Sequence, residues 1–230
     1  MFLNDCYFQK NMKTHFVEVK YDVKVTIPKV VLDKLPTEIM LFLTAQLMDQ
    51  KEDIIKQLQK AGKKVFLTKP RHTIHEGQIL GCSTEKADGN FEAFFYIGDG
   101  MFHPQALVIK NDRPVHIWDA INEKYKLLTK KDAEMTRNRI NAARTAFLMS
   151  KNIGVLVTTK PGQNKLAHFM KIRSNYSDKQ FYYLVNNNIE FDRLEDFPFI
   201  DCFVNTACER IATDDYDKFN RPVLNFEDLP

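Results

Sequence analysis

The stretch FEAFFYIGDGMFHP, Phe91 to Pro104, decides the expected fold because a strand, a sharp turn and the start of a helix follow one another in it. Its first half is a short apolar run, rich in aromatic residues that suit a buried strand. Gly98 and Gly100 allow the backbone to turn sharply, and Pro104 suits the first turn of a helix beginning near Phe102. Similar runs alternate with amphipathic segments along the chain, which predicts an α/β fold with parallel sheets.

The sequence predicts two small αβα domains in tandem, residues 1–130 and 131–230, which look related to each other. Strands are expected at 15–25, 38–45, 63–69, 91–100 and 114–120 in the first half, and at 153–159, 180–185 and 200–205 in the second. A helix is expected over 49–61, with Asp49 and Glu52 in capping-box spacing. Residues 129–154 predict the helix that joins the halves, because Thr129 and Asp132 also have this spacing.

Length and charge exclude several classes of protein. The chain has 230 residues, 44% of them hydrophobic, which is enough for a sizeable core. A net charge of +3 with well-mixed signs does not indicate nucleic-acid binding. There is no apolar run of the roughly 18 residues that a membrane span needs, and the start is too polar for a signal peptide. We therefore expect a cytoplasmic protein with neither a membrane nor a nucleic acid as its partner.

The cysteines are the first candidates for chemistry. In a cytosolic protein, thiols are more often core residues, metal ligands or catalytic groups than disulfides. Cys202 lies in the middle of an expected strand and fits the core, whereas Cys82 and Cys208 follow loops and turns. Neither of these two belongs to a C-x-x-C pair, so a site that uses both must bring them together from separate domains. Cys208 is expected near a helix start, where a thiolate is favoured, and Arg210 can bind a carboxylate through two hydrogen bonds.

Three segments are expected at the carboxyl ends of strands, where open parallel sheets bind ligands. They are GDGMFHP (98–104), TTKPGQ (158–163) and NTACERIA (205–212). The first holds Asp99 and His103 and is either a plain turn or a ligand loop. In the second, Gln163 is expected to begin a helix whose free N–H groups face an anion.

Two weaker patterns compete with these segments. The glycine turn with Asp119 about 20 residues later imitates a dinucleotide fingerprint, but His103 stands where the third small residue belongs. This leaves a nucleotide-binding oxidoreductase or transferase as a third class of function. The pair His72 and His75 lies in a polar loop and suits either metal binding or an ordinary surface role.

Taken together and in this order, the motifs HEGQILGCS, GDGMFHP, TTKPGQ and NTACERIATDD, followed by RPVLNFEDL, resemble the archaeal form of the diphthamide synthase family, the 2-(3-amino-3-carboxypropyl)histidine synthases. The match runs from about His15 to the end of the chain. In that family three similar α/β domains each give one cysteine to a [4Fe-4S] cluster. The open iron holds S-adenosylmethionine, whose 3-amino-3-carboxypropyl radical attacks a histidine of translation elongation factor 2.

The resemblance assigns roles to individual residues. It implies that Cys82, in the middle-domain position, and Cys208, in the last-domain position, are catalytic cluster ligands. It also places a group of residues on segments that line the S-adenosylmethionine pocket, namely Gly98, Asp99, Gly100, His103, Gln163 and Arg210.

The family's first domain and its cysteine have no counterpart in this sequence, and Cys6 lies in no family motif. The chain is therefore expected to be a fragment, one part of a split enzyme or a non-catalytic relative. The third ligand would come from a homodimer or from a partner chain that supplies the missing domain. The leading hypothesis is radical-type transfer to elongation factor 2, and the alternative is an accessory subunit of a diphthamide synthase complex.

Overall fold

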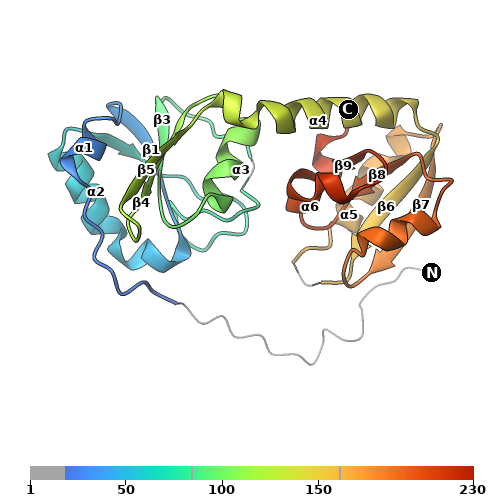
Figure 1. Ribbon diagram of the computed structural model, residues 1–230, viewed down its shortest axis with the longest axis horizontal. Helices are drawn as coiled ribbons and strands as arrows, with labels where there is room; N and C mark the ends of the chain where they lie inside the picture. Colours follow the sequence, from blue (N-terminus) through green and yellow to red (C-terminus); the bar gives the residue numbers. More distant parts are fainter. Residues whose placement is uncertain (1–18, 84, 161) are drawn as a thin grey trace. The chain divides into compact units, whose positions relative to one another are not determined.

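Two parallel sheets, one in each half of the chain, form the framework of the protein (Figure 1). The computed structural model describes residues 19–83, 85–160 and 162–230. Within them the chain divides into two compact units, a first unit that ends at Met135 and a second unit that runs from Thr136 to Pro230. The expected α/β fold with tandem parallel sheets is confirmed. The assignment of residues 1–130 and 131–230 to the middle and last domains of the family's proteins stays a prediction.

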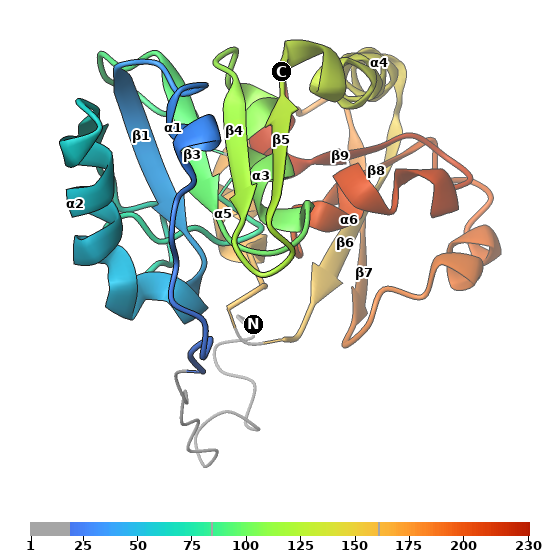
Figure 2. The same ribbon diagram turned by 60° about the vertical axis from the view of Figure 1, so that its left-hand side comes forward.

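The first unit has three layers, with a sheet between helices. The strand order is β2-β1-β3-β4-β5, in which β5 alone is antiparallel to its neighbour. The strands are β1 Glu38–Leu43, β2 Lys64–Phe66, β3 Ala93–Ile97, β4 Val115–Asp119 and β5 Lys124–Leu128. The helices are α1 Lys29–Leu32, α2 Lys51–Lys60 and α3 Phe102–Lys110, with 3-10 turns η1 Ala45–Gln50 and η2 Lys130–Ala133. Figure 2 views this sheet with α1 in front of it and α3 behind it.

The second unit repeats the plan with an entirely parallel sheet in the order β7-β6-β8-β9. Its strands are β6 Asn152–Thr158, β7 Gln180–Asn186, β8 Cys202–Asn205 and β9 Val223–Asn225. Its helices are α4 Glu134–Met149, α5 Leu166–Ile172 and α6 Arg210–Asp214, with 3-10 turns η3 Arg173–Asn175, η4 Phe191–Asp196, η5 Tyr216–Lys218 and η6 Phe226–Asp228. Helices α4 and α5 cover one face of the sheet, whereas η4 and α6 cover the other.

The central strands are apolar along their whole length because both faces of each sheet are covered. In β1, Leu41 packs towards α1 and α2, and its neighbour Phe42 packs towards the α3 side. Such continuous apolar runs are typical of parallel strands between two helix layers. In both units the first strand lies between the second and the third, so the chain changes direction at β1/β3 and at β6/β8. These two switch points are where open α/β sheets bind ligands.

The strand expected over 15–25 is wrong for the described part of that stretch. Residues 19–28 contain no strand. The side-chain amides of Gln50 and Gln57 take the place of a neighbouring strand. Gln50 donates to the Val23 carbonyl and accepts from the Val25 N–H, both at 2.8 Å.

Gln57 makes the same pair of contacts one step further along. Its Oε1 accepts from the Ile27 N–H at 2.9 Å, and its Nε2 donates to the Val25 carbonyl at 3.0 Å. The two glutamines are seven residues apart, which is two helical turns, so their side chains point the same way from α2 and its N-cap. The backbone groups of Val23, Val25 and Ile27 therefore bind helix side chains and not a neighbouring strand.

The start of α2 and the two strands β5 and β9 also differ from the expectation. Helix α2 begins at Lys51, since residues 45–50 form a 3-10 turn, so the expected cap at Asp49 is not its N-terminus. Strands β5 and β9 were not expected, because β5 is largely polar and β9 has only three residues. The contact between Thr129 and Asp132 is confirmed, with the Thr129 N–H donating to Asp132 Oδ2 at 2.7 Å. Among the described residues, no helix has the length and apolar character needed to cross a membrane.

Replacing Gln57 with alanine should destabilise the first unit by about 1 to 2 kcal/mol, because two half-buried backbone groups lose their partners. The measurement is urea unfolding of the full chain. Gln59→Ala, at an exposed position of the same helix, should change the free energy of unfolding by less than about 0.5 kcal/mol. Equal effects of the two variants would contradict the role given to Gln57.

The stability of the first unit should fall as the pH drops below about 6.5, the ordinary pKa of histidine. Burial lowers the pKa of His116, which lies 2.9 Å from the Tyr125 hydroxyl, and nearby Lys63 lowers it further. The unfolded chain therefore binds a proton in a pH range where the folded chain does not, and the fold loses stability there. Urea unfolding midpoints at about pH 8 and about pH 5.5 test this.

The variant His116→Gln should reduce that loss of stability, whereas His72→Gln, at an exposed position of the same unit, should leave it unchanged. An equal pH dependence of His116→Gln and the unaltered chain would show that other groups cause it.

Candidate functional site

Cys82 lies at the carboxyl edge of the first sheet, although it belongs to the long connection between β2 and β3. The Leu43 N–H at the end of β1 donates to the Gly77 carbonyl at 2.7 Å, and the Leu43 carbonyl accepts from the Ile79 N–H at 3.0 Å. This part of the connection therefore extends the sheet beside β1 for one bridge. Cys82 lies three residues after Ile79 and is half-buried.

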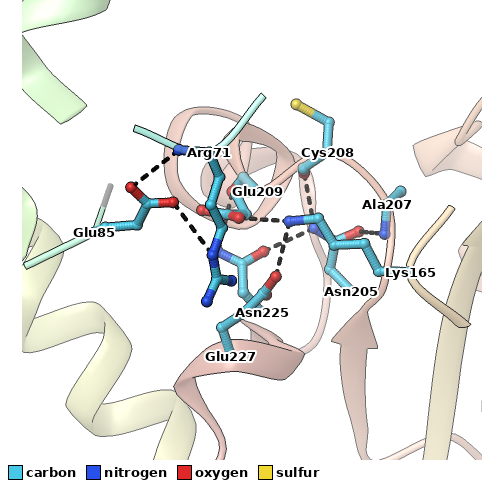
Figure 3. Close-up of polar contacts among 9 residues, drawn as sticks. All are labelled: Arg71, Glu85, Lys165, Asn205, Ala207, Cys208, Glu209, Asn225 and Glu227. Atoms are coloured by element: carbon cyan, nitrogen blue, oxygen red, sulfur yellow. Dashed lines mark hydrogen bonds and ion pairs between the residues drawn. The ribbon is translucent and has the colours of Figure 1, made fainter. Parts of the chain in front are cut away.

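Close packing fixes the turn that carries Cys82. A Cβ atom at Gly81 would lie 2.5 Å from Cζ of Phe102, the first residue of α3, so a larger residue there would have to displace this half-exposed ring. Ser83 closes the turn, since its N–H donates to the Leu80 carbonyl at 2.9 Å and its Oγ accepts from the Leu80 N–H at 3.1 Å. An exposed ion pair between Arg71 and Glu85, at 3.6 Å, joins the two ends of this loop within the first unit (Figure 3).

The glycine turn after β3 lies at the β1/β3 switch point, and its two glycines do different things. A Cβ at Gly98 would lie 2.5 Å from Thr44 Cγ2 and 2.5 Å from the Tyr96 hydroxyl, so Gly98 is needed for internal packing. Gly100 has a φ of +63° and nothing within 4 Å of its Cβ position. Glycine suits this left-handed backbone, and a ligand contact at Gly100 stays a prediction.

The remaining residues of this turn are held by tyrosines. Tyr96 is buried and donates from its hydroxyl to the Asp99 carbonyl at 3.0 Å. The Asp99 side chain is hydrogen-bonded to Tyr21, and burial followed by this contact raises the pKa of Tyr21. The ring of His103 stacks against Tyr96 with 6.3 Å between centroids. Asp99 and His103 therefore stand at an ordered, partly exposed edge.

Two asparagines that end neighbouring strands hold the Cys208 turn in the second unit. Asn205 and Asn225 are paired in register at the ends of β8 and β9. The Asn205 Nδ2 donates to Asn225 Oδ1 and to the Cys208 carbonyl, both at 2.8 Å, and its Oδ1 accepts from the Ala207 N–H at 3.0 Å. The Asn225 Nδ2 donates to the Glu209 carbonyl at 3.0 Å. Both asparagines are nearly inaccessible, at 1% and 4% exposure.

A lysine between two glutamates adds a second support (Figure 3). Lys165 Nζ lies 2.5 Å from Glu209 Oε1 and 2.8 Å from Glu227 Oε1, and the Lys165 N–H donates to the Thr206 carbonyl at 2.8 Å. Burial acts to lower the pKa of Lys165, but the two carboxylates outweigh it and raise the pKa. Burial raises the pKa of Glu227, against the effect of Lys165. The cluster joins the β6–α5 loop, the Cys208 turn and the C-terminal turn η6.

Arg210 binds a carboxylate of its own chain, but not through the two parallel hydrogen bonds expected of it, because two of its nitrogens contact the same oxygen. Its side chain is 6% exposed, and its Nε and Nη2 lie 2.9 Å and 2.7 Å from Asp214 Oδ2. A role at the cofactor stays a prediction for Arg210. The expected helix start at Gln163 is wrong, because α5 begins at Leu166, whose N–H donates to Asn164 Oδ1 at 3.0 Å. Gln163 lies in the exposed turn before it.

Cys202 differs from the other described cysteines. It is fully buried in β8, and burial raises the pKa of its thiol to about 12, so it fits the core and not a ligand set. Cys6 lies outside the described residues. Within residues 19–83, 85–160 and 162–230, no three histidine, cysteine, aspartate or glutamate side chains gather as a metal site. Each unit thus offers one half-buried thiol, Cys82 or Cys208, at the carboxyl edge of its sheet.

Asp119, the acidic residue of the competing dinucleotide pattern, has a structural role in the β4–β5 turn. Asp119 Oδ1 accepts from the N–H groups of Ile121 and Asn122 at 3.1 Å and 2.9 Å, which closes the β4–β5 hairpin. Partial burial acts to raise the pKa of Asp119, but these hydrogen bonds outweigh it and lower the pKa. The carboxylate that would bind a ribose is used by the turn.

Sequence reasoning assigned no supporting role to the residues that hold the Cys208 turn, namely Lys165, Asn205, Glu209, Asn225 and Glu227, although the last four lie in the quoted motifs NTACERIA and RPVLNFEDL. A usable signal exists only for the asparagines. Each is a polar residue at the end of an apolar strand, which is unusual for a buried position.

The profile of the diphthamide synthesis protein family matches residues 2–229. A 2-(3-amino-3-carboxypropyl)histidine synthase from Pyrococcus horikoshii is 29% identical over 196 residues, which cover 84% of this chain and 56% of that protein. The 2-(3-amino-3-carboxypropyl)histidine synthase subunit 1 from Schizosaccharomyces pombe is 29% identical over 224 residues, covering 91% of this chain and 50% of that protein. The chain therefore spans about half the length of these relatives.

Solved structures agree with this match. The crystal structure of Dph2 from Pyrococcus horikoshii superimposes with a TM-score of 0.72 at 27% identity, over 86% of this chain and 57% of that chain. The structure of the same protein with a 4Fe-4S cluster gives a TM-score of 0.70 at 26% identity, over the same shares of 86% and 57%.

Gly98→Ala should destabilise the first unit by about 1 to 3 kcal/mol, because its Cβ would overlap two buried side chains. Gly100→Asn is the matched control, since a side chain there meets open space and asparagine tolerates a positive φ. Urea unfolding should show a clearly smaller effect for the control. A tolerated Gly98→Ala would contradict the packing role of Gly98.

Proposed function

Because this chain belongs to the diphthamide synthesis protein family, we propose that it takes part in the first step of diphthamide biosynthesis. In that step the 3-amino-3-carboxypropyl group of S-adenosylmethionine passes to a histidine of translation elongation factor 2. The observation that carries the proposal is the position of Cys82 and Cys208, each half-buried at the carboxyl edge of a parallel sheet. The radical type of the transfer and a cytoplasmic location rest on the resemblance of the motifs.

Cys82 and Cys208 would hold the [4Fe-4S] cluster as thiolates. Their chemistry and partial exposure suit cluster ligation, whereas the buried thiol of Cys202 does not. Such clusters are usually held by three or four cysteines, so at least one further ligand must come from outside the described residues. A second copy, a partner chain or Cys6 are the available sources. When bound, the cluster supplies one-electron chemistry.

The chain's own residues would bind and orient the cofactor at the two switch points. Gly100 leaves open space beside the backbone, with Asp99 and His103 next to it on an ordered turn. Gln163 is exposed on the corresponding loop of the second unit. Arg210 would act on the cofactor through the segment that it orders with Asp214, since its Nε and Nη2 contact that carboxylate.

An accessory subunit is the second candidate function. It is favoured by the presence of only two suitable thiols in the described residues. In this role the chain would dock on a catalytic homologue, and Cys82 and Cys208 would not bind iron.

Anaerobic reconstitution with iron and sulfide separates the two candidates. With its partner or as an oligomer, the chain should take up a [4Fe-4S] cluster, visible by EPR after reduction and by the iron count per chain. Cys82→Ala and Cys208→Ala should each lose the signal, because the ligand set is already small. Cys202→Ala is the matched control and should retain it, since its thiol is buried in the core.

Unchanged iron binding in Cys82→Ala and Cys208→Ala would overturn the ligand assignment. If no iron binds to the chain under any of these conditions while a catalytic homologue is captured, the accessory role is supported instead.

A further inference from the structure

We propose that Asn225 and Lys165 are positioning residues for Cys208, so that the C-terminal segment 225–228 fixes the place of this thiol. The reason for such positioning rests on the proposed function of Cys208 as a ligand. The mechanical claim, that these side chains hold the turn, rests on contacts and can be tested without iron.

The first support acts on the backbone on both sides of the thiol. The carbonyl of Cys208 accepts from Asn205, and the carbonyl of Glu209 accepts from Asn225, while the two amides bind each other at 2.8 Å. Two consecutive carbonyls of the turn are therefore fixed to the ends of β8 and β9. A buried amide that loses its partner is costly, so the network favours a single arrangement.

The second support acts on the side chain that follows the thiol. Glu209 is 15% exposed, and its carboxylate is held by Lys165, which also binds Glu227 of η6. Removing three charged groups from water is unfavourable for stability unless they are well paired. The Cys82 turn is held differently, by a contact of Gly81 with Phe102 and by hydrogen bonds of Ser83.

The consequence is that two segments distant in sequence hold one short turn. Lys165 comes from the β6–α5 loop, Cys208 and Glu209 from the β8–α6 turn, and Asn225 and Glu227 from the C-terminal segment. Groups around ligands set where the ligands point, and loss of such support weakens metal sites. The thiol of Cys208 is half-buried, so a loosened turn should expose it.

The test is the alkylation rate of each cysteine by iodoacetamide in the reduced, iron-free full chain, read by mass spectrometry of the peptides. The limiting rate at high pH is compared, because it does not depend on the thiol pKa. In Asn225→Ala and Lys165→Met, the alkylation rate of Cys208 should rise at least about fivefold. This factor corresponds to the loss of one buried hydrogen bond that holds the turn closed. Lys165→Arg should largely restore the slow rate.

Matched controls change the same residue types elsewhere in the second unit. Asn220→Ala and Lys171→Met alter exposed side chains and should leave the Cys208 rate within about twofold. Cys82 is the internal reference, and continued protection of the buried Cys202 shows that the second unit stays folded. If Cys202 becomes reactive in Asn225→Ala, the milder variant Asn225→Ser replaces it.

An unchanged Cys208 rate in both Asn225→Ala and Lys165→Met, with Cys202 protected, would overturn the positioning role even where the chain binds a cluster. A raised Cys208 rate in a chain that binds no iron with any partner would support the positioning role while the proposed function fails. The two claims therefore have separate readouts.

Discussion

The parallel direction of the strands is the constraint on which the rest of the protein depends. When β1, β3, β6 and β8 all run the same way as their neighbours, every connection must return to the opposite edge before the next strand begins. The turns that leave the strands are then collected along the carboxyl edge of each sheet. The glycine turn after β3 and the Cys208 turn after β8 stand at equivalent switch points for this reason.

The same constraint explains why polar groups accumulate at the edges. Buried strands provide no place for an unpaired amide or charge, whereas their last residues can bind the backbone of the turn that follows. Asn205 and Asn225 do so in the second unit, and their pairing extends the strand register by a side-chain hydrogen bond. In the first unit Tyr96 has the corresponding task, since its buried ring ends in a hydroxyl that binds the next turn.

Sequence patterns predicted the buried strands. They did not predict the hydrogen bonds by which side chains hold backbone groups elsewhere in the chain. The apolar runs of β3, β6 and β8 were found because strands covered on both faces are apolar throughout. Residues 19–25 alternate like a strand, yet the amides of Gln50 and Gln57 bind them, and no local pattern reveals a helix acting as a strand partner. The motifs singled out Cys82 and Cys208 as expected ligands, but the supports of Cys208 include Lys165, 43 residues before it, and Asn225, 17 residues after it. Such long-range contacts are set by topology and not by local sequence.

Cys202 and Cys208 show how position determines the chemistry of a residue. Cys202 lies in β8, and Cys208 lies in the turn that follows this strand. Inside β8 the thiol of Cys202 has no solvent to stabilise a negative charge, so burial raises its pKa to about 12 and it packs as a small apolar side chain. Beyond the end of β8 the thiol of Cys208 is half-buried, and its backbone carbonyl is held by Asn205. A ligand needs both properties, access to the metal and a defined direction, and the edge of a parallel sheet is the part of this fold that provides them together.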